Sequence, residues 1–426
     1  MTSTSTYRPW TVDPDRWPDV AVAAGSPARA AVARLLFGAA GVRLPLRVHL
    51  PGGSLHGAGG PGTPVMRIRR PREFFRRLGA SGLIGFGESY LAGEWDSTDL
   101  TGLLTVFAAH TAELVPPPLQ RLRQLAVRRQ PPGDRQTIAG ARHNIGRHYD
   151  LSNDLFALFL DETMTYSCAL FADPSAPGDL AEAQRRKIDR LLDRAGVGPG
   201  CRVLEIGTGW GELAIRAARR GATVRTITIS REQHALAARR VAGAGLAGRV
   251  SVELRDYRDL DGRFDAICSV EMLEAVGERY WDAYFAALDR HLAPGGRIGL
   301  QTITMAHDRM LATRHTYTWI QKYIFPGGQL PSITAIQDSL AATRLRITSR
   351  EDFGAHYAET LRIWRERFGG QADEVARLGF DEVFRRMWNF YLCYSEAGFR
   401  AGYIGVSQLT LARTGADQIL AGRPAR

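Results

Sequence analysis

The stretch Val203-Leu-Glu-Ile-Gly-Thr-Gly-Trp-Gly211 decides the fold of this chain. An apolar run that predicts a buried strand surrounds Glu205, and three glycines follow at every second position. Glycines let the backbone approach a ligand closely and turn into the next helix. The Glu205 carboxylate would face a ligand that carries a cation and ribose hydroxyls. The pattern favours a site for S-adenosylmethionine (SAM), although a lone glycine-rich loop is a weak signal.

Strands and helices alternate around this stretch. The predicted strands are Arg202–Ile206, Thr223–Ile229, Val250–Leu254, Phe264–Val270 and Arg297–Thr302. The predicted helices are Glu212–Arg220, Arg231–Ala242 and Tyr280–His291, and a Pro294-Gly-Gly296 turn is expected before the fifth strand. Short apolar strands separated by helices predict an α/β fold, with a doubly wound and mostly parallel sheet covered on both faces.

The regions on either side of this core have a different character. Before it we expect helices and strand-like pieces at Ala28–Ala40, Leu44–Leu50, Val65–Ile68, Pro71–Leu78 and Leu100–Ala109, with a glycine-rich turn region at Gly52–Gly62. After it we expect helices Thr334–Thr343, Tyr357–Phe368 and Phe380–Phe399 and a last strand Tyr403–Leu411. Proline-rich segments indicate a linker. The predicted division is an α+β domain at 1–125, a linker at 126–141 and a catalytic domain at 142–426.

Length and cysteine usage restrict the class of protein. The chain has 426 residues, enough for two domains with a large core. Its four cysteines are scattered without metal-ligand spacing, which argues against a disulfide framework or a zinc site. Residues 1–10 are polar, unlike a signal peptide, and no apolar run reaches the roughly 18 residues of a membrane span. We therefore expect a cytoplasmic protein.

The net charge of +11 is unevenly distributed. Residues 1–142 contain 18 arginines, no lysine and 10 acidic residues, a net charge of +8. A basic region suits an anionic partner, either nucleic acid or the surface of an anionic membrane. The alternative is a generally arginine-rich composition with a solvated surface.

The ends of the predicted strands supply the candidate ligand-binding residues, because ligands of open α/β sheets bind beyond the carboxyl ends of the strands. The first three ends offer Glu205, Gly207, Gly209, Gly211, Thr228, Ser230, Gln233, Asp256 and Tyr257. An NAD-binding domain would place an acidic residue at the second end, where this chain has hydroxyls and an amide. A dehydrogenase is therefore disfavoured. The fourth end reads Glu271-Met-Leu-Glu274 and the fifth Gln301-Thr-Ile303.

Several separated motifs resemble one family. They are His148–Phe156, Met164–Ala169, Lys322–Gly328 and Phe353–Tyr357, together with the strand ends above and the segment 80–100. Over roughly residues 140–410 the chain resembles the cyclopropane-fatty-acid synthases and related SAM-dependent lipid methyltransferases. The resemblance implies a class I SAM-dependent methyltransferase fold with a seven-stranded sheet. It also places Tyr166 and Ser167 in the SAM pocket.

The resemblance implies a reaction at a carbon–carbon double bond of an unsaturated phospholipid acyl chain. Methyl transfer from the sulfonium of SAM leaves a carbocation, and a base then removes a proton. In the family the base is a bicarbonate ion, and its ligands correspond by motif to Cys168, Glu274, Gln301, Ile303 and Tyr357. Read alone, Cys168 would be a buried apolar residue and Glu274 a carboxylate near a helix start. We expect Glu274→Gln to nearly abolish turnover while SAM binding survives.

Aromatic residues in the C-terminal half are candidates for a dry pocket around the carbocation, which ring faces can stabilise. The candidates are Tyr317, Trp319, Tyr323, Phe325, Tyr391 and Tyr394. Of these, Tyr317 is the one that we place among the catalytic residues. The alternative for such a set is ordinary core packing.

Three positions depart from the family pattern. Gln301 and Ala275 stand where histidine is usual, and Thr208 replaces a common cysteine. Glutamine donates a hydrogen bond but cannot titrate or carry charge, which puts bicarbonate binding in question.

The segment Glu271–Gly277, with Gln301 and Thr316–Trp319, resembles the branch that installs a methylene group on oleoyl chains. A separate flavin- or NADPH-dependent reductase would convert the 10-methylene product to a 10-methyl fatty acid such as tuberculostearate. Cyclopropane formation shares the first step and stays open as the alternative. The two products differ by a hydride shift, which cannot be read from the sequence. Because of the +8 charge and the lipid substrate, we expect residues 1–142 to dock on the inner face of an anionic membrane and help present an acyl chain to the catalytic domain. The resemblance also implies a homodimer.

Two other classes of function compete with this interpretation. A nucleic-acid methyltransferase would be basic too, but the chain has no Asn/Asp-Pro-Pro-Tyr/Phe motif and no paired catalytic cysteines, so no nucleic-acid partner is expected. A non-catalytic lipid-binding protein would explain Gln301. The intact glycine loop and Glu274 argue against it.

Overall fold

The computed structural model describes residues 10–53, 55–111, 152–176 and 178–413, and these form two compact units. The first unit contains the described residues up to 111 together with Tyr317–Tyr323 and Phe368–Ala401. The second contains 152–316, Ile324–Arg367 and the residues from Gly402 on. The first unit therefore takes in two segments from the C-terminal half of the chain. The predicted linker at 126–141 and the start of the His148 motif lie outside the described residues.

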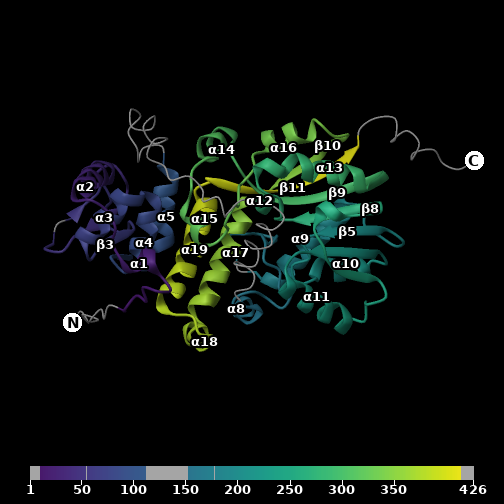
Figure 1. Ribbon diagram of the computed structural model, residues 1–426, viewed down its shortest axis with the longest axis horizontal. Helices are drawn as coiled ribbons and strands as arrows, with labels where there is room; N and C mark the ends of the chain where they lie inside the picture. The colour runs from purple at the N-terminus through teal and green to yellow at the C-terminus, as the bar shows by residue number, and fades with distance from the viewer. Residues whose placement is uncertain (1–9, 54, 112–151, 177, 414–426) are drawn as a thin grey trace, which may run out of the picture. The chain divides into compact units, whose positions relative to one another are not determined.

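The first unit is a small α+β structure (Figure 1). Its helices are α1 (Pro18–Ala21), α2 (Pro27–Gly41), α3 (Pro71–Ser81), α4 (Leu83–Leu91), α5 (Leu100–Ala109), α15 (Trp319–Tyr323), α18 (Ala372–Arg377) and α19 (Glu382–Arg400). Its strands are β1 (Arg47–His49), β2 (Leu55–His56), β3 (Val65–Ile68) and β4 (Trp95–Ser97), in the order β2-β1-β3-β4. Strands β1 and β3 are parallel, and the other pairs are antiparallel.

Aromatic packing and one buried ion pair hold the first unit together. The ring centroids of Phe86 and Trp95 lie 4.6 Å apart, and the Trp95 indole N–H donates to the Phe86 carbonyl over 3.0 Å. Arg77 and Glu94 form an ion pair of 2.9 Å in which both side chains are buried. The Arg77 guanidinium also donates to the Val20 carbonyl over 2.6 Å. These bonds compensate for the cost of burying the charge.

The second unit is an α/β structure with a seven-stranded sheet. Its strands are β5 (Arg202–Ile206), β6 (Thr223–Thr228), β7 (Val250–Leu254), β8 (Phe264–Val270), β9 (Leu292–Met305), β10 (Leu345–Asp352) and β11 (Ile404–Arg413). Its helices are α8 (Asn153–Ala157), α9 (Leu180–Arg194), α10 (Glu212–Arg219), α11 (Arg231–Gly243), η2 (Tyr257–Asp259), α12 (Leu273–Val276), η3 (Glu278–Tyr280), α13 (Trp281–His291), α14 (His307–Thr313), α16 (Ile333–Leu340) and α17 (Gly354–Gly369).

The sheet is mostly parallel, as predicted. Its order is β10-β11-β9-β8-β5-β6-β7, in which β5 to β9 run parallel and β11 runs antiparallel to both neighbours. Helices α9, α10 and α11 contribute to one core and α12, α13 and α16 to the other. The apolar strands are buried between these layers, which is why they read as nearly continuous apolar runs. The predicted doubly wound α/β fold with a mostly parallel, seven-stranded sheet is confirmed.

Two local expectations are wrong, and one segment contains elements that were not predicted. The predicted turn Pro294–Gly296 lies inside β9, where the pairing with β8 shifts register, so the strand begins earlier than expected. The glycine-rich region 52–62 contains the short strand β2 rather than turns alone. Segment 80–100 forms α4 and β4, neither of which the sequence pattern delimited. In the described parts of the chain, no helix has the length and apolar character needed to cross a membrane.

Candidate active site

A cleft opens at the carboxyl ends of β5, β6 and β8, entirely within the second unit. Its empty space is about 1180 Å³, part of it open to solvent, which is ample for a nucleoside-sized ligand. The predicted SAM-binding residues that line it are Tyr166, Ser167, Glu205, Gly207, Gly209, Thr228, Gln233, Asp256 and Tyr257. Gly211 and Ser230 do not line it but form the N-caps of α10 and α11.

The glycine loop needs its glycines for conformation and for space. Gly207, Gly209 and Gly211 have φ angles of 94°, 51° and 92°, in the left-handed region that favours glycine. A Cβ added at Gly207 would lie 2.4 Å from Cγ of Met272. The Met272 side chain thus fills the space that a side chain at Gly207 would need.

Glu205 leaves a polar atom unsatisfied at the cleft wall. Its side chain is only 4 % exposed, and its Oε2 accepts no hydrogen bond. Burial raises the pKa of Glu205 to about 8, against the lowering effects of a hydrogen bond from Thr226 and of the Lys187 charge. Because a buried carboxylate oxygen without a partner is costly, a ligand with hydroxyl groups or a positive charge would stabilise it. This arrangement fits the ribose and sulfonium of SAM.

The next two strand ends are held by short-range bonds. Thr228 donates to the Gln233 amide oxygen over 2.9 Å, and Ser230 caps α11 by accepting from the Gln233 backbone N–H over 3.2 Å. Both carboxylate oxygens of Asp256 bind the Arg258 guanidinium, over 2.7 and 2.8 Å. Burial, the largest effect, raises the pKa of Tyr257 to about 12, so its hydroxyl keeps its proton at neutral pH.

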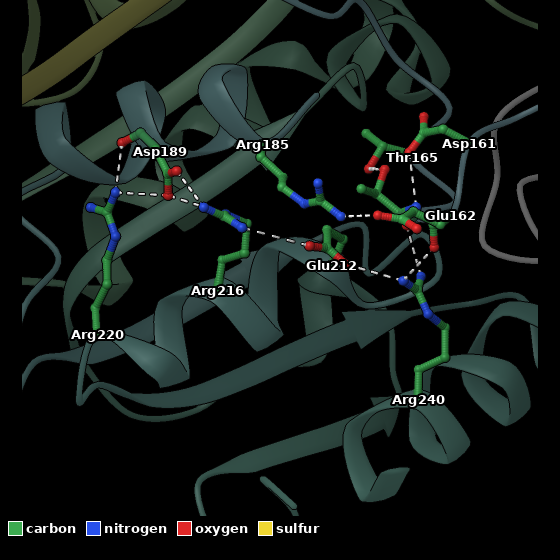
Figure 2. A network of polar contacts seen from close by, with 10 residues as sticks. Asp161, Glu162, Thr165, Arg185, Asp189, Glu212, Arg216, Arg220 and Arg240 are labelled. Atoms are coloured by element: carbon green, nitrogen blue, oxygen red, sulfur yellow. Dashed lines mark hydrogen bonds and ion pairs between the residues drawn. The ribbon is translucent and has the colours of Figure 1, made fainter. Parts of the chain in front are cut away.

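The segment that carries Tyr166 and Ser167 is fixed by a polar network (Figure 2). The Arg240 guanidinium donates to the carbonyls of Thr163 and Trp210 over 2.8 and 2.9 Å, and it pairs with Glu212 over 3.0 Å. It thereby links α11, the glycine loop and the segment before Tyr166. Lys187 of α9 donates to the Ser167 hydroxyl over 2.6 Å, and burial lowers the Lys187 pKa to about 8.

The same network continues along the helices (Figure 2). Asp189 of α9 pairs with Arg216 and, over 2.9 Å, with Arg220. Arg216 also lies 4.0 Å from Glu212 at the start of α10. Several linked, partly buried charges hold a loop more firmly than one exposed pair does. The network therefore fixes one wall of the cleft.

Glu271 is the centre of a second cluster at the end of β8. Its Oε1 accepts from the Cys168 backbone N–H over 2.9 Å and from the Gln301 amide over 2.8 Å. Its Oε2 accepts from the Tyr357 hydroxyl over 2.6 Å. Glu271 has a φ of 51°, which is uncommon for a residue other than glycine. It also lines the cleft, so this carboxylate joins the cluster to the SAM-binding space.

Glu274 lies in different surroundings three residues on. Its Oε1 accepts from the Ile303 backbone N–H and, over 3.0 Å, from the Thr302 hydroxyl. Its Oε2 is buried without a hydrogen-bond partner. Burial, followed by the nearby Glu271 charge, raises the pKa of Glu274 to about 8.

The five residues expected around a bicarbonate ion thus fall into two groups. Cys168, Gln301 and Tyr357 converge on Glu271, whereas Ile303 contacts Glu274. The donors that would hold bicarbonate are therefore already bound to a carboxylate of the chain. A second anion at the same place would be repelled by that charge. The residues present do not fit bicarbonate.

The predicted aromatic residues are divided between the units. Tyr317, Trp319, Tyr323, Tyr391 and Tyr394 belong to the first unit, and Phe325 belongs to the second. Within the second unit, Trp364 packs between two site residues, with ring-centroid distances of 5.1 Å to Tyr166 and 6.2 Å to Tyr357. Trp364 was not among the residues chosen from the sequence.

Sequence reasoning also missed Glu271 and Lys187 as site residues. Lys187 is fully buried in a helix that the sequence pattern did not delimit, and no motif marks it. Glu271 could have been found from the sequence. Two glutamates, Glu271 and Glu274, follow one strand, and the same chain has glutamine at position 301 where the family usually has histidine.

Comparison with known proteins identifies the family of the chain. The family model described as mycolic acid cyclopropane synthetase matches residues 136–409. A tuberculostearic acid methyltransferase of Mycobacterium tuberculosis is 57 % identical over 413 residues, 95 % of this chain and 97 % of that protein. The cyclopropane-fatty-acyl-phospholipid synthase of Escherichia coli K12 is 36 % identical over 82 % of this chain and 87 % of its own length.

Solved structures show the same relationship. A cyclopropane synthase from M. tuberculosis is 34 % identical, with a TM-score of 0.59 over 64 % of this chain and 98 % of that one. A mycolic acid cyclopropane synthase complexed with SAH and CTAB has the same identity and TM-score over 63 % and 97 %. The chain therefore belongs to the mycolic acid cyclopropane synthetase family of SAM-dependent methyltransferases.

Proposed function

We propose that this protein transfers a methyl group from SAM to the double bond of an oleoyl chain in a phospholipid, and that the product is a 10-methylene acyl chain. The observation that carries this proposal is the 57 % identity to a tuberculostearic acid methyltransferase across nearly the whole of both chains. The family also contains cyclopropane synthases. According to the resemblance described above, these enzymes also act on a double bond of an acyl chain.

The site supports the first step. When bound, SAM supplies a sulfonium methyl group, an electrophile strong enough to react with an alkene. Glu205 would accept hydrogen bonds from the ribose, and Thr228 and Asp256 also line the cleft. The buried rings of Trp364 and Tyr357 lie near the Glu271 cluster, where they would help to exclude water from a reactive cation. Tyr317 remains a candidate for the same task.

The fate of the cation distinguishes two products. A hydride shift followed by loss of a proton from the new methyl group gives an exocyclic methylene. Direct loss of that proton with ring closure gives a cyclopropane, and the 36 % identity to the E. coli synthase keeps this second product as the alternative. Bicarbonate is not part of the proposed reaction, because its expected donors are bound to Glu271.

The identity of the product tests this proposal. The protein would be incubated with SAM and oleoyl phospholipid vesicles, and the released fatty acids would be examined by proton NMR. Vinylidene protons are the expected result. High-field ring protons would establish the cyclopropane alternative, and no methylated acyl chain with an intact, SAM-binding protein would contradict both.

We further propose that the first unit docks the protein on the inner face of an anionic membrane and that a reductase acts on the methylene product. The charge of +8 in residues 1–142 supports the docking. Sedimentation with anionic vesicles should fall with added salt and with the exposed-site changes Arg67→Glu and Arg72→Glu. Arg239→Glu, an exposed change on α11, is the matched control. Vesicle binding that is unchanged by salt and by the first two substitutions would refute docking through this unit.

A homodimer, which the family resemblance implies, would be tested by light scattering.

A further inference from the structure

We propose that the Glu271 carboxylate is the base that removes the proton after methyl transfer, in place of a bound bicarbonate ion. This inference rests on the proposed function, because it assigns a residue to the second half of the same reaction. It follows from which groups contact Glu271 and from where that carboxylate lies.

Three donors of the chain hold Glu271 where a base is needed. They are the Cys168 backbone N–H, the Gln301 amide and the Tyr357 hydroxyl, at 2.9, 2.8 and 2.6 Å. These are three of the five positions that the family resemblance assigned to bicarbonate. A carboxylate carries the same single negative charge as bicarbonate and, like bicarbonate, shares it between two oxygens. The chain thus supplies, as the side chain of Glu271, the negative charge that would otherwise come from an external ion.

The hydrogen bonds also decide which of the two neighbouring glutamates is ionised. These three groups all donate hydrogen bonds to Glu271, so they suit its carboxylate form. Glu274 has a buried Oε2 without a partner, and this atom can carry a proton. Burial raises the pKa of both groups, and the Tyr357 hydroxyl is the strongest of the contacts that oppose this effect at Glu271. The hydrogen bonds therefore favour a proton on Glu274 over a proton on Glu271.

A chain of amides orients Gln301 toward Glu271. The Arg190 guanidinium donates to the Gln408 oxygen over 2.7 Å, and the Gln408 amide donates to the Gln301 oxygen over 3.0 Å. The Gln301 amide nitrogen is then left to donate to Glu271. Glutamine at position 301 donates a hydrogen bond without titrating, which suits a partner such as Glu271 that is part of the chain and stays ionised. This accounts for the departure from histidine at position 301.

The backbone at Glu271 supports a functional placement. A φ of 51° is a conformation in which glycine is comfortable and other residues are rare. Strained positions of this kind concentrate at functional sites. Here the strain accompanies a side chain that reaches both the cleft and the cluster of three donors.

The bond between the sulfur and the methyl carbon breaks, its electrons remain on sulfur, and the alkene supplies the pair for the new carbon–carbon bond. Glu271 then takes a proton from the resulting cation. The electrons of that carbon–hydrogen bond form either the methylene double bond or the third side of a cyclopropane. The carboxylic acid afterwards returns the proton to solvent.

Two variants and one buffer change test the assignment. In CO₂-free buffer, wild-type turnover should equal that with added bicarbonate, whereas stimulation by bicarbonate would overturn the proposal. Glu271→Gln should lower turnover by about a hundredfold or more, the scale of a lost general base, with SAH affinity unchanged. Glu271→Gly should lose as much, and added bicarbonate or formate should restore part of it. Wild-type turnover in either variant would refute the assignment.

Folding and the proposed function are controlled separately. Glycine suits the φ of residue 271, so Glu271→Gly should retain the thermal unfolding midpoint. Glu278→Gln, which removes a partly exposed carboxylate paired with Arg314, is the matched control and should retain activity.

A binding measurement does not require turnover. In ¹³C NMR, labelled bicarbonate should broaden on addition of Glu271→Gly but not of the wild type. Wild-type binding would overturn the proposal even if the protein methylates some lipid other than an oleoyl chain. Conversely, a wild type that makes no product yet behaves as expected in this titration would refute the proposed function alone.

Discussion

The two halves of the cleft are built differently. At the ends of β5 and β6, the predicted SAM-binding residues are held by partners close in sequence, as Thr228 is by Gln233 five residues on. At the ends of β8 and β9, Glu271 is held by partners 103, 30 and 86 residues away in the chain. The first half leaves a Glu205 oxygen unsatisfied, whereas the second provides its own partners for Glu271. The first half thus leaves a Glu205 oxygen available to a ligand, whereas in the second half the chain itself supplies the hydrogen-bond donors of Glu271.

The strongest test of this contrast is Glu205→Ala. Glu205 can form two hydrogen bonds with the ribose, and each ordinary hydrogen bond contributes about 0.5–1.5 kcal/mol, so we expect SAH affinity to fall roughly fivefold to a hundredfold or slightly more. Isothermal titration would measure it. The ¹³C-bicarbonate titration should stay silent in this variant, because the Glu271 cluster is untouched. Unchanged SAH affinity would mean that the unsatisfied oxygen does not face the ligand.

Tyr357→Phe weakens the other half alone. It removes the 2.6 Å hydrogen bond to Glu271 and leaves a buried carboxylate oxygen without that donor. Turnover should fall about tenfold, as expected for roughly 1.4 kcal/mol, with SAH affinity unchanged. If this variant lost SAH affinity but kept its turnover rate per bound SAM, the two halves of the cleft would not act independently.

Glu274→Gln distinguishes the two carboxylates. Because the Glu274 pKa is about 8, glutamine resembles its protonated form at neutral pH. Turnover should therefore fall by less than in Glu271→Gln, in contrast to the near loss that the sequence alone led us to expect. A larger loss than in Glu271→Gln would return the role of base to Glu274.

The same variant gives a prediction about pH and stability. A carboxyl group whose pKa is raised on folding stabilises the protein fully below its unfolded pKa and loses this contribution as pH rises through its folded pKa. For Glu274 the loss falls between the ordinary pKa of 4.5 and about 8. The wild-type midpoint of thermal unfolding should decline over this range, and it should decline less in Glu274→Gln. Equal slopes would contradict the raised pKa.

The smallest expected effect is that of Gln301→His. Histidine still has an N–H for the Glu271 carboxylate, so activity should persist, and the ratio of methylene to cyclopropane product is the quantity to follow. Turnover should stay within about tenfold, the value of a single ordinary hydrogen bond. Complete inactivity would show that the amide chain through Gln408 is indispensable.

The contrast also explains how much the sequence revealed. The parallel sheet and its helices were predictable because strand and helix periods are local, and strands β5, β7 and β8 have the predicted bounds. Nine of the eleven predicted SAM-binding residues line the cleft, since strand ends meet at one edge of such a sheet. Their role in binding SAM stays a prediction.

The partners of Glu271 were not predictable from spacing. Hydrogen bonds among positions 168, 271, 301 and 357 depend on the packing of four separate segments. The motif match brought Cys168, Gln301 and Tyr357 together correctly, but it placed them around an ion instead of a side chain. The sequence also did not predict which segments belong to the first unit, because α15 and α19 are far along the chain from its other elements.

The contact between Met272 and Gly207 restricts how this protein can change. Met272 stands between the two glutamates in sequence, and its side chain fills the space over Gly207 in the glycine loop. A larger or smaller residue at 272 would shift the loop that receives the methyl donor and the backbone that carries Glu271 at the same time. A substitution at position 272 should therefore change both the affinity for the methyl donor and the product. Related proteins that differ at this position should carry compensating substitutions in the glycine loop or near the glutamates.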